Sequence, residues 1–365
     1  MENENLVEKA KQLKDKTEQN PIPLGITGLV NLGNTCFMNS TIQILRNTKK
    51  LNTILNEYDE DDKHKNNIEE TAIFDEWNML RKTMNSQSIT LSPKRFLYFI
   101  HELAKSKNLE LFSGFSQNDL SEFLLFIIES LHSTISQKYD QKYDQKYDQK
   151  YDQKYDLEQT IEHIVDAMLN TVYQKEHSKI MDLFYGVIIS EILSIDGTVI
   201  HKSKAEQYFM LDLELPEEST YKNIYDCIEE YTCAEILDED NAWFNEKTGK
   251  KEDIQKRIRF WSFPDILIIT LKRFSPDGTN KMNDFVDYPV EGLDLTRYIS
   301  TRETTPYQYN LYGVCCHYGM VNGGHYTAFV KQGEDWFHYN DHIVEKIPEK
   351  NVVSPYAYCL FYTRI

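Results

Sequence analysis

The sequence has few cysteines, and they do not show the spacing of metal or redox motifs. Six occur in 365 residues, and no two of them form a C-x-x-C motif. A content this low argues against a secreted scaffold held together by disulfides. Because free thiols persist in reducing surroundings, we expect the protein in the cytoplasm, the nucleus or both.

Long apolar runs are also lacking. The two longest, at 123–128 and 266–271, are far shorter than the roughly 20 residues that cross a membrane. The first 20 residues are strongly charged and contain no apolar core of signal-peptide length. We therefore expect a soluble protein with no membrane partner.

The chain has fewer basic than acidic residues. Lysine and arginine number 40 against 58 aspartates and glutamates, so the formal charge is −18. This excess of acid disfavours nucleic acid and anionic membranes as partners. It favours a basic partner, but it is equally typical of an acidic surface that selects no partner. With 41% apolar residues, the chain can still form a substantial core.

One cysteine stands in a setting that makes thiols reactive. The segment 28–40 reads GLVNLGNTCFMNS, and the apolar spacing after Cys36 predicts a helix that begins there, with Asn34 or Thr35 as its N-cap. A helix N-terminus lowers the pKa of a thiol, and glycines let a substrate backbone approach closely. The alternative is a small buried cysteine with no chemistry.

A histidine and an asparagine far downstream could complete a catalytic site. Strand-like runs occur at 309–319 (YNLYGVCCHYG), 323–328 (GGHYTA) and 336–341 (WFHYND). A cysteine nucleophile needs a histidine base, and that base needs a hydrogen-bond partner on its other ring nitrogen. His325 and Asn340 suit these roles, although a single histidine in a short motif is more often structural.

Two helices and a repeat are predicted in the middle of the chain. Ser116 and Asp119 resemble a capping box, and apolar residues then repeat at helical spacing through residue 131. Five copies of QKYD follow at 137–156, where a four-residue period drifts about 40° per copy on a helix. We interpret them as a low-complexity insertion, marginally helical or disordered, before a second helix from 157 to about 172.

The cysteine and histidine segments resemble the corresponding boxes of the ubiquitin-specific protease family of deubiquitinases. The resemblance covers residues 25–365 and includes QNDLSEFL at 117–124, PDILIITLKRF at 264–274 and AYCLFY at 357–362, in the family's order. It implies a papain-like cysteine protease of α+β class, with a helical thumb, a β-rich palm and fingers. Residues 1–24 would be a polar extension before this catalytic domain.

The resemblance also implies a mechanism. Cys36 would attack the carbonyl of ubiquitin's terminal glycine, and His325 would take the thiol proton and later give a proton to the departing lysine amine. Water would then release the thioester acyl-enzyme. The Asn31 side chain and the backbone N–H of Cys36 match the family's oxyanion donors, although Asn31 could instead form a turn.

The third catalytic residue is left open between two neighbours. The family's position, four residues after the tryptophan, falls on Asn340, whereas Asp341 could add electrostatic support or polarise a water. Because successive strand side chains point to opposite sides, we expect only one of the two to touch His325.

The resemblance implies a channel for the ubiquitin tail, with no cofactor. Asp119 is a candidate tail ligand, with capping of its helix as the equally weighted alternative. His317 is expected to line the channel or pack structurally and not to act as the base. The predicted tail-binding residues are Gln117, Asp119, His317, Gly324 and Tyr326.

The fingers, at about 186–262, are expected to fold without metal. Many family members hold a zinc there with two C-x-x-C pairs, but this chain has IDGT at 195–198 and NEKTG at 245–249, which are typical of tight hairpin turns. Cys227 and Cys233 alone cannot supply the four ligands that zinc needs.

The expected partners are ubiquitin and ubiquitinated proteins, met by a monomer. Two other hypotheses remain: a scaffold that binds ubiquitin without cleaving it, and a protease for another ubiquitin-like modifier. The presence of Cys36, His325 and Asn340 argues against the scaffold.

Overall fold

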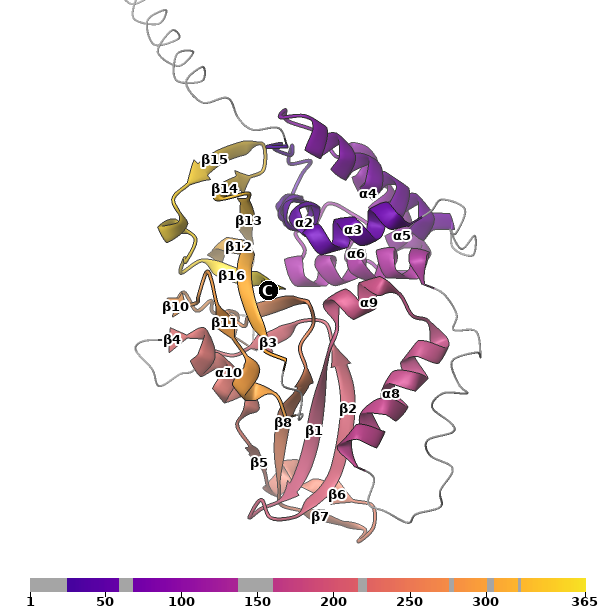
Figure 1. The fold of residues 1–365 in the computed structure, drawn as a ribbon, viewed down its shortest axis with the longest axis vertical. Helices are drawn as coiled ribbons and strands as arrows, with labels where there is room; N and C mark the ends of the chain where they lie inside the picture. The colour runs from indigo at the N-terminus through magenta and orange to yellow at the C-terminus, as the bar shows by residue number, and fades with distance from the viewer. Residues whose placement is uncertain are drawn as a thin grey trace, which may run out of the picture.

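The computed structural model describes residues 25–58, 68–136, 160–215, 222–275, 279–300, 305–320 and 323–365. The predicted extension at 1–24 and the QKYD repeats at 137–156 lie outside these ranges. The described chain forms a large sheet, a group of helices against it and a smaller sheet that projects away (Figure 1). These are the palm, thumb and fingers of the expected α+β fold.

The palm is a sheet whose strands are antiparallel except for one parallel pair at its edge. Its long central strands are rich in valine, isoleucine, leucine and aromatic residues, which suit a sheet that is covered on both faces. The strands, in spatial order, are β15 (Ile343–Ile347), β14 (Asp335–Asn340), β13 (Gly323–Gln332), β12 (Gln308–Met320), β16 (Ala357–Arg364), β9 (Ile266–Leu271) and β3 (Leu211–Leu213), with β11 (Leu293–Asp294) paired to β12.

The thumb consists of helices whose apolar faces pack on one another and on the palm. Trp77, Phe96 and Phe123 lie in this shared core and are fully buried. The first helix contacts both the other thumb helices and strands β12 and β13, so nearly all of it is buried. The thumb helices are α2 (Cys36–Asn47), α3 (Lys49–Glu57), α4 (Ile68–Ser86), α5 (Lys94–Ser106), α6 (Leu120–Ile135) and α9 (Lys179–Phe184).

The fingers are a second sheet with a helix packed on it. Helix α8 (Ile161–Lys175) places Val165 against Val187, Ile189 and Ala205 of the sheet, which gives the fingers a small core of their own. The sheet runs in the order β2 (Ile200–Tyr208), β1 (Gly186–Ser194), β8 (Ile254–Ser262) and β5 (Glu235–Leu237), and the hairpin of β6 (Trp243–Asn245) and β7 (Lys250–Glu252) lies at its tip (Figure 1).

A small group of elements lies beside the palm, on the side away from the thumb (Figure 1). It contains β4 (Lys222–Asn223), helix α10 (Ile224–Thr232), β10 (Val286–Asp287), which pairs with β4, and the 3-10 turn η4 (Thr296–Tyr298). The remaining 3-10 turns are η3 (Glu239–Asn241) and η5 (Glu349–Asn351).

Several sequence predictions for local structure are confirmed. The helix predicted after Asp119 is α6, and the turns predicted at 195–198 and 245–249 join β1 to β2 and β6 to β7. The predicted capping box of Ser116 and Asp119 is wrong: Asp119 itself is the N-cap, and its Oδ1 accepts the backbone N–H groups of Ser121 and Glu122. The second predicted helix is α8, which begins at 161 and ends at 175.

A buried carboxylate ties two finger strands together. Glu191 on β1 is 0% exposed, and its oxygens accept hydrogen bonds from Arg257 at 2.6 and 3.2 Å and from Arg259 at 2.7 Å. Both arginines come from β8 and are only partly exposed. A buried carboxylate of this kind is stable only while it keeps its cationic partners.

Replacing both arginines by methionine is therefore expected to lower the free energy of unfolding by about 3–5 kcal/mol, because Glu191 would be left buried and unpaired. Adding Glu191→Leu to the same protein should recover most of that loss. Urea denaturation monitored by fluorescence measures both values. If the triple variant is no more stable than the double variant, the lost stability comes from packing and not from the unpaired charge.

Candidate active site

Cys36 is the first residue of helix α2, where the sequence predicted a nucleophile. It is 4% exposed. The residue at the N-cap position is Thr35, whose side chain does not cap the helix; its Oγ1 accepts the N–H of Leu32 instead. Asn34 has a φ of 55°, a left-handed conformation that asparagine tolerates and that turns the chain into the helix.

Asn31 shapes the loop before Cys36. Its Oδ1 accepts hydrogen bonds from the backbone N–H groups of Gly33 and Thr35, at 3.0 and 3.1 Å. Its Nδ2 donates to Asp341 at 3.0 Å. The turn-forming role considered for Asn31 is therefore present in the structure. A carboxamide carries two N–H protons, so the second remains for an oxyanion donor role, which stays a prediction.

His325 faces Cys36 from strand β13. Its Nε2 lies 2.7 Å from Oδ1 of Asn340, the last residue of the adjacent strand β14, and the imidazole also hydrogen-bonds to Cys36. The amide oxygen of Asn340 can only accept, so Nε2 carries a proton. The hydrogen bond to Cys36 and that to Asn340 raise the pKa of His325 to about 9, although partial burial acts in the opposite direction.

Asp341 lies near His325 but forms no hydrogen bond with it, so only one of the two neighbours touches the imidazole directly, as expected. It lies just beyond β14 with a φ of 51°, so its side chain does not follow the alternation of the strand. Its carboxylate is 3.9 Å from Nε2 of His325, beyond hydrogen-bond distance, and accepts the amides of Asn31 and Asn39, the latter at 2.8 Å. Asn340 alone is hydrogen-bonded to the imidazole, and Asp341 adds charge behind it.

A pocket of about 330 Å³ opens beside the nucleophile, between thumb and palm. Gln117 spans its two sides, because its side-chain amide exchanges hydrogen bonds with the backbone N–H and C=O of Gly324 at 3.2 and 3.3 Å. All five predicted tail-binding residues line it together with Cys36: Gln117, Asp119, His317, Gly324 and Tyr326. Their role toward a ligand remains a prediction.

Asp119 is held firmly on both of its oxygens. While Oδ1 caps helix α6, Oδ2 accepts hydrogen bonds from the hydroxyls of Tyr358 at 2.6 Å and Tyr326 at 3.2 Å. The capping alternative is thus confirmed, and the other oxygen belongs to the pocket. The sequence predicted no role for Tyr358, which binds Asp119, or for Phe274, which lines the pocket. Both residues lie in segments that carry the family resemblance, and this was the signal that could have identified them.

His317 is a wall of the pocket and not a second base. Its ring is buried, 4.7 Å from that of Tyr326 and 5.4 Å from that of Phe274. Burial lowers the pKa of His317 to about 4, so it is neutral at pH 7. The ring lies so close to Gly324 that a Cβ atom there would overlap it, which explains the need for glycine at this point.

The described residues contain no group of three or more histidine, cysteine, aspartate or glutamate side chains placed to hold a metal ion. In the fingers and the adjoining helix, Cys227 is buried and Cys233 is exposed, and burial raises the pKa of the Cys227 thiol to about 11. A protonated thiol is a poor zinc ligand. Over the same described ranges, no helix has the length and apolar character to cross a membrane.

A thiol, an imidazole and an amide in this order, between a helical and a β-rich half, define a papain-like cysteine hydrolase. The family model described as ubiquitin carboxyl-terminal hydrolase matches residues 27–362, and the chain belongs to that family. This agrees with the resemblance found in the sequence.

Known relatives support the assignment. Human ubiquitin carboxyl-terminal hydrolase 2 is 31% identical over 351 residues, which cover 93% of this chain and 55% of the relative. Ubiquitin carboxyl-terminal hydrolase 4 of Saccharomyces cerevisiae is 31% identical over 378 residues, with coverages of 93% and 39%. The chain thus spans about half the length of these relatives, or less.

A solved structure has the same fold. The SAGA DUB module Ubp8/Sgf11/Sus1/Sgf73 bound to monoubiquitin contains a chain that is 25% identical, with a TM-score of 0.67; the match covers all of this chain and 76% of that one. This likeness extends over thumb, palm and fingers together.

Proposed function

We propose that the protein is a cysteine-dependent deubiquitinase, which hydrolyses the peptide or isopeptide bond after the C-terminal glycine of ubiquitin. The observation that carries the proposal is the contact of Cys36 with an imidazole held by Asn340, beside a pocket lined by all five predicted tail-binding residues. The solved relative bound to monoubiquitin supports ubiquitin as the partner. We further propose a monomer in the cytoplasm or nucleus.

The first half-reaction forms a thioester. His325, whose raised pKa favours the imidazolium, takes the thiol proton of Cys36 before the attack. The sulfur then adds to the carbonyl carbon of the terminal glycine, and the carbonyl oxygen becomes an oxyanion. The backbone N–H of Cys36 and the second N–H of Asn31 are the proposed donors to it, with Asn31 oriented by Asp341. The C–N bond then breaks as the His325 imidazolium protonates the departing amine.

The second half-reaction reverses the roles. A water gives one proton to His325 as its oxygen attacks the thioester carbonyl. The C–S bond then breaks as the His325 imidazolium returns that proton to the Cys36 sulfur, and the ubiquitin carboxylic acid loses its remaining proton to solvent. His317, Gly324 and Tyr326 form one wall of the pocket, and the missing side chain at Gly324 lets a ligand backbone approach that wall closely.

A ubiquitin that carries an electrophile at its C-terminus tests the proposal directly. The purified chain should form a covalent adduct in which mass spectrometry locates the modification on Cys36. A scaffold without activity would bind the probe and form no adduct. A protease for another modifier would react faster with the matching modifier probe than with ubiquitin, which would refute ubiquitin as the substrate.

The raised pKa of His325 predicts the alkaline limit of activity. Because the imidazolium must protonate the leaving amine, the rate should be retained up to pH 9 and fall above it, as the ring loses its proton near its pKa of about 9. The measurement is kcat/KM on a ubiquitin isopeptide substrate from pH 6 to 10. An alkaline limb near pH 6.5, the ordinary histidine value, would show that Cys36 and Asn340 do not hold the proton on the ring.

A further inference from the structure

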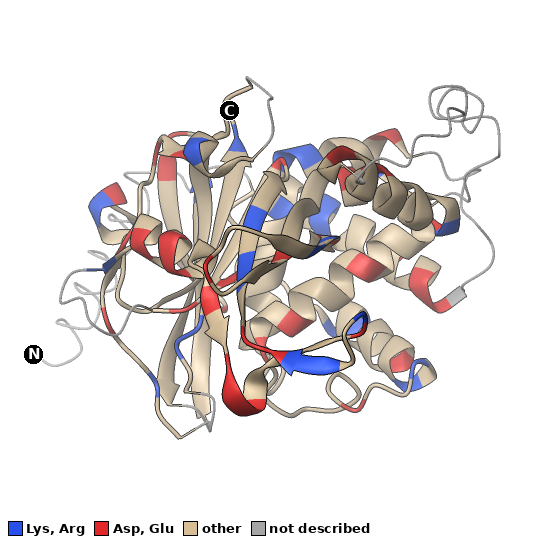
Figure 2. Ribbon diagram, turned by 90° about the horizontal axis from the view of Figure 1, so that it is seen from below, with Lys and Arg blue, Asp and Glu red and all other residues tan. Residues whose placement is uncertain are grey.

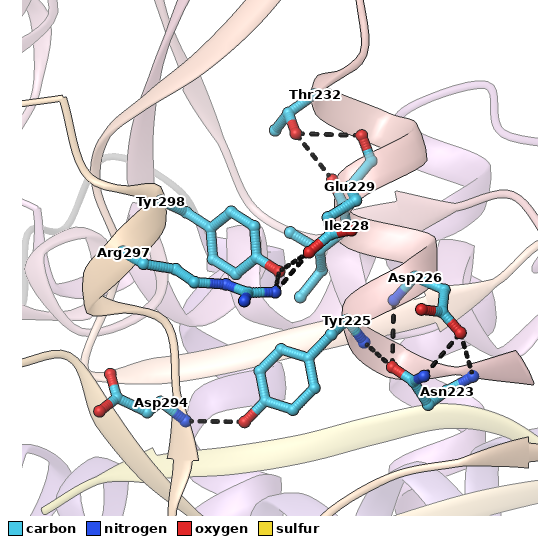
Figure 3. A network of polar contacts seen from close by, with 9 residues as sticks. All are labelled: Asn223, Tyr225, Asp226, Ile228, Glu229, Thr232, Asp294, Arg297 and Tyr298. Carbon is cyan, nitrogen blue, oxygen red and sulfur yellow. Dashed lines mark hydrogen bonds and ion pairs between the residues drawn. The ribbon is translucent and has the colours of Figure 1, made fainter.

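A second cavity, of about 930 Å³, lies beside the palm between α10, β11 and η4. None of the described residues lines both this cavity and the pocket at Cys36. Its polar contacts are drawn in Figure 3. The lining residues most relevant here are Tyr225, Asp226, Glu229, Asp287, Asp294 and Arg297.

The cavity is strongly acidic. Four carboxylates line it, those of Asp226, Glu229, Asp287 and Asp294, against the single guanidinium of Arg297. Asp294 accepts hydrogen bonds from neutral donors, the backbone N–H of Thr296 and the Gln308 amide. Acidic residues are spread over most of the molecule (Figure 2), but here they surround a concave space, which concentrates their field.

The cavity does not suit an anion, even though a helix begins in it. The first N–H groups of α10 are already taken, because Oδ1 of Asn223 accepts those of Tyr225 and Asp226 at 2.9 and 3.1 Å (Figure 3). Asp226 in turn accepts from Asn223, which completes a capping box. The N–H groups of Tyr225 and Asp226 are therefore not available to a ligand, and the nearest charge is negative.

The cavity already holds one guanidinium, which shows what chemistry it accepts. Arg297 lies over the rings of Tyr298 and Tyr225, 4.7 and 5.4 Å from their centroids. Its Nη2 donates to Glu229 at 2.5 Å and to the Tyr298 hydroxyl at 2.6 Å (Figure 3). A planar cation on aromatic faces, with a carboxylate at its edge, is a favourable setting for arginine. Arg297 is also 59% exposed, so an incoming side chain can reach the same aromatic faces and carboxylate from solvent.

We propose that this cavity binds an arginine-containing basic segment of a partner protein. An incoming guanidinium would lie against Tyr225 and pair with Asp294 or with Glu229 in place of Arg297. Arginine fits better than lysine, because a planar guanidinium can stack on an aromatic ring and at the same time donate two parallel hydrogen bonds to a carboxylate. This inference does not depend on the proposed hydrolase activity.

The test uses a fluorescent peptide of alternating arginine and glycine, with anisotropy as the readout on the full chain. A peptide with citrulline at each arginine has the same shape without the charge. The double variant Glu229→Gln with Asp294→Asn keeps an acceptor oxygen at each position and should bind the arginine peptide at least about tenfold more weakly. The matched control is Glu246→Gln with Asp253→Asn, which removes two exposed charges at the fingertips.

A gain of affinity gives the sharper result, since misfolding cannot produce it. Arg297→Gln removes the resident guanidinium and should tighten peptide binding several-fold, whereas Lys247→Gln, which removes an exposed positive charge at the fingertips, should leave it unchanged. Equal weakening in the two double variants, equal binding of the citrulline peptide, or equal gains in the two single variants would refute the cavity as the site. Hydrolysis of a ubiquitin reporter should be unchanged throughout, which separates this test from that of the proposed activity.

Discussion

Replacing Cys36 by alanine is expected to abolish hydrolysis of ubiquitin conjugates and to leave ubiquitin binding within a few-fold of its original affinity. Loss of a covalent nucleophile lowers kcat by a factor on the order of 10⁶, because no other group can form the acyl intermediate. Binding depends on a much larger surface of thumb, palm and fingers, of which a sulfur atom is a negligible part. Single-turnover cleavage of a ubiquitin isopeptide and calorimetric titration with ubiquitin measure the two effects.

The chain supplies its own control for this experiment. Cys233 is an exposed free cysteine near the fingers, so Cys233→Ala removes the most accessible other thiol among the described residues. It should retain full activity and full labelling by a ubiquitin electrophile. Turnover by Cys36→Ala near the original rate would reject the nucleophile, and loss of activity in Cys233→Ala would point to a different reactive thiol.

The positions of Cys36 and His325 in the fold could be predicted from the sequence because they depend on local settings, whereas their catalytic roles remain predictions. Cys36 lies where glycines and the start of a helix coincide, and His325 lies on a strand after two glycines. That two segments so far apart in the sequence form one site was predicted from the family resemblance and not from the spacing of apolar residues. Apolar spacing predicted α6 well because a helix that packs on a core must repeat its apolar face.

The side-chain networks could not be predicted, because they depend on contacts between distant elements. The two bonds that Asp119 accepts from tyrosines link α6 to β13 and β16. The contacts of Glu191 with Arg257 and Arg259 depend on how β1 is aligned with β8, and no local sequence pattern predicts that alignment. Only one of the two neighbours touches His325, as expected, but strand alternation is not the reason. Asp341 lies beyond the strand with a positive φ, and such a left-handed residue is not visible as such in a sequence.

The two residues at the end of β14, Asn340 in the strand and Asp341 just beyond it, are expected to differ in effect, with Asn340→Ala more damaging than Asp341→Ala. Asn340 forms the 2.7 Å hydrogen bond that fixes the ring and the tautomer of His325. Its loss should lower kcat/KM by about 10²–10⁴, by comparison with the third member of other triads. Asp341 acts at 3.9 Å on the histidine and through Asn31 on the oxyanion, so Asp341→Ala should cost less, about 10²-fold at most.

The pH profile separates a catalytic effect from a loss of structure. Because the hydrogen bond to Asn340 helps to raise the pKa of His325, Asn340→Ala should move the alkaline limb of kcat/KM from near pH 9 toward lower pH. Asp341→Ala removes a smaller electrostatic contribution and should move the limb less, while Asn340→Asp should retain the hydrogen bond and much of the rate. If Asp341→Ala gives the larger loss and the larger shift in folded protein, Asp341 is the residue that supports the base, and Asn340 only positions the end of the strand.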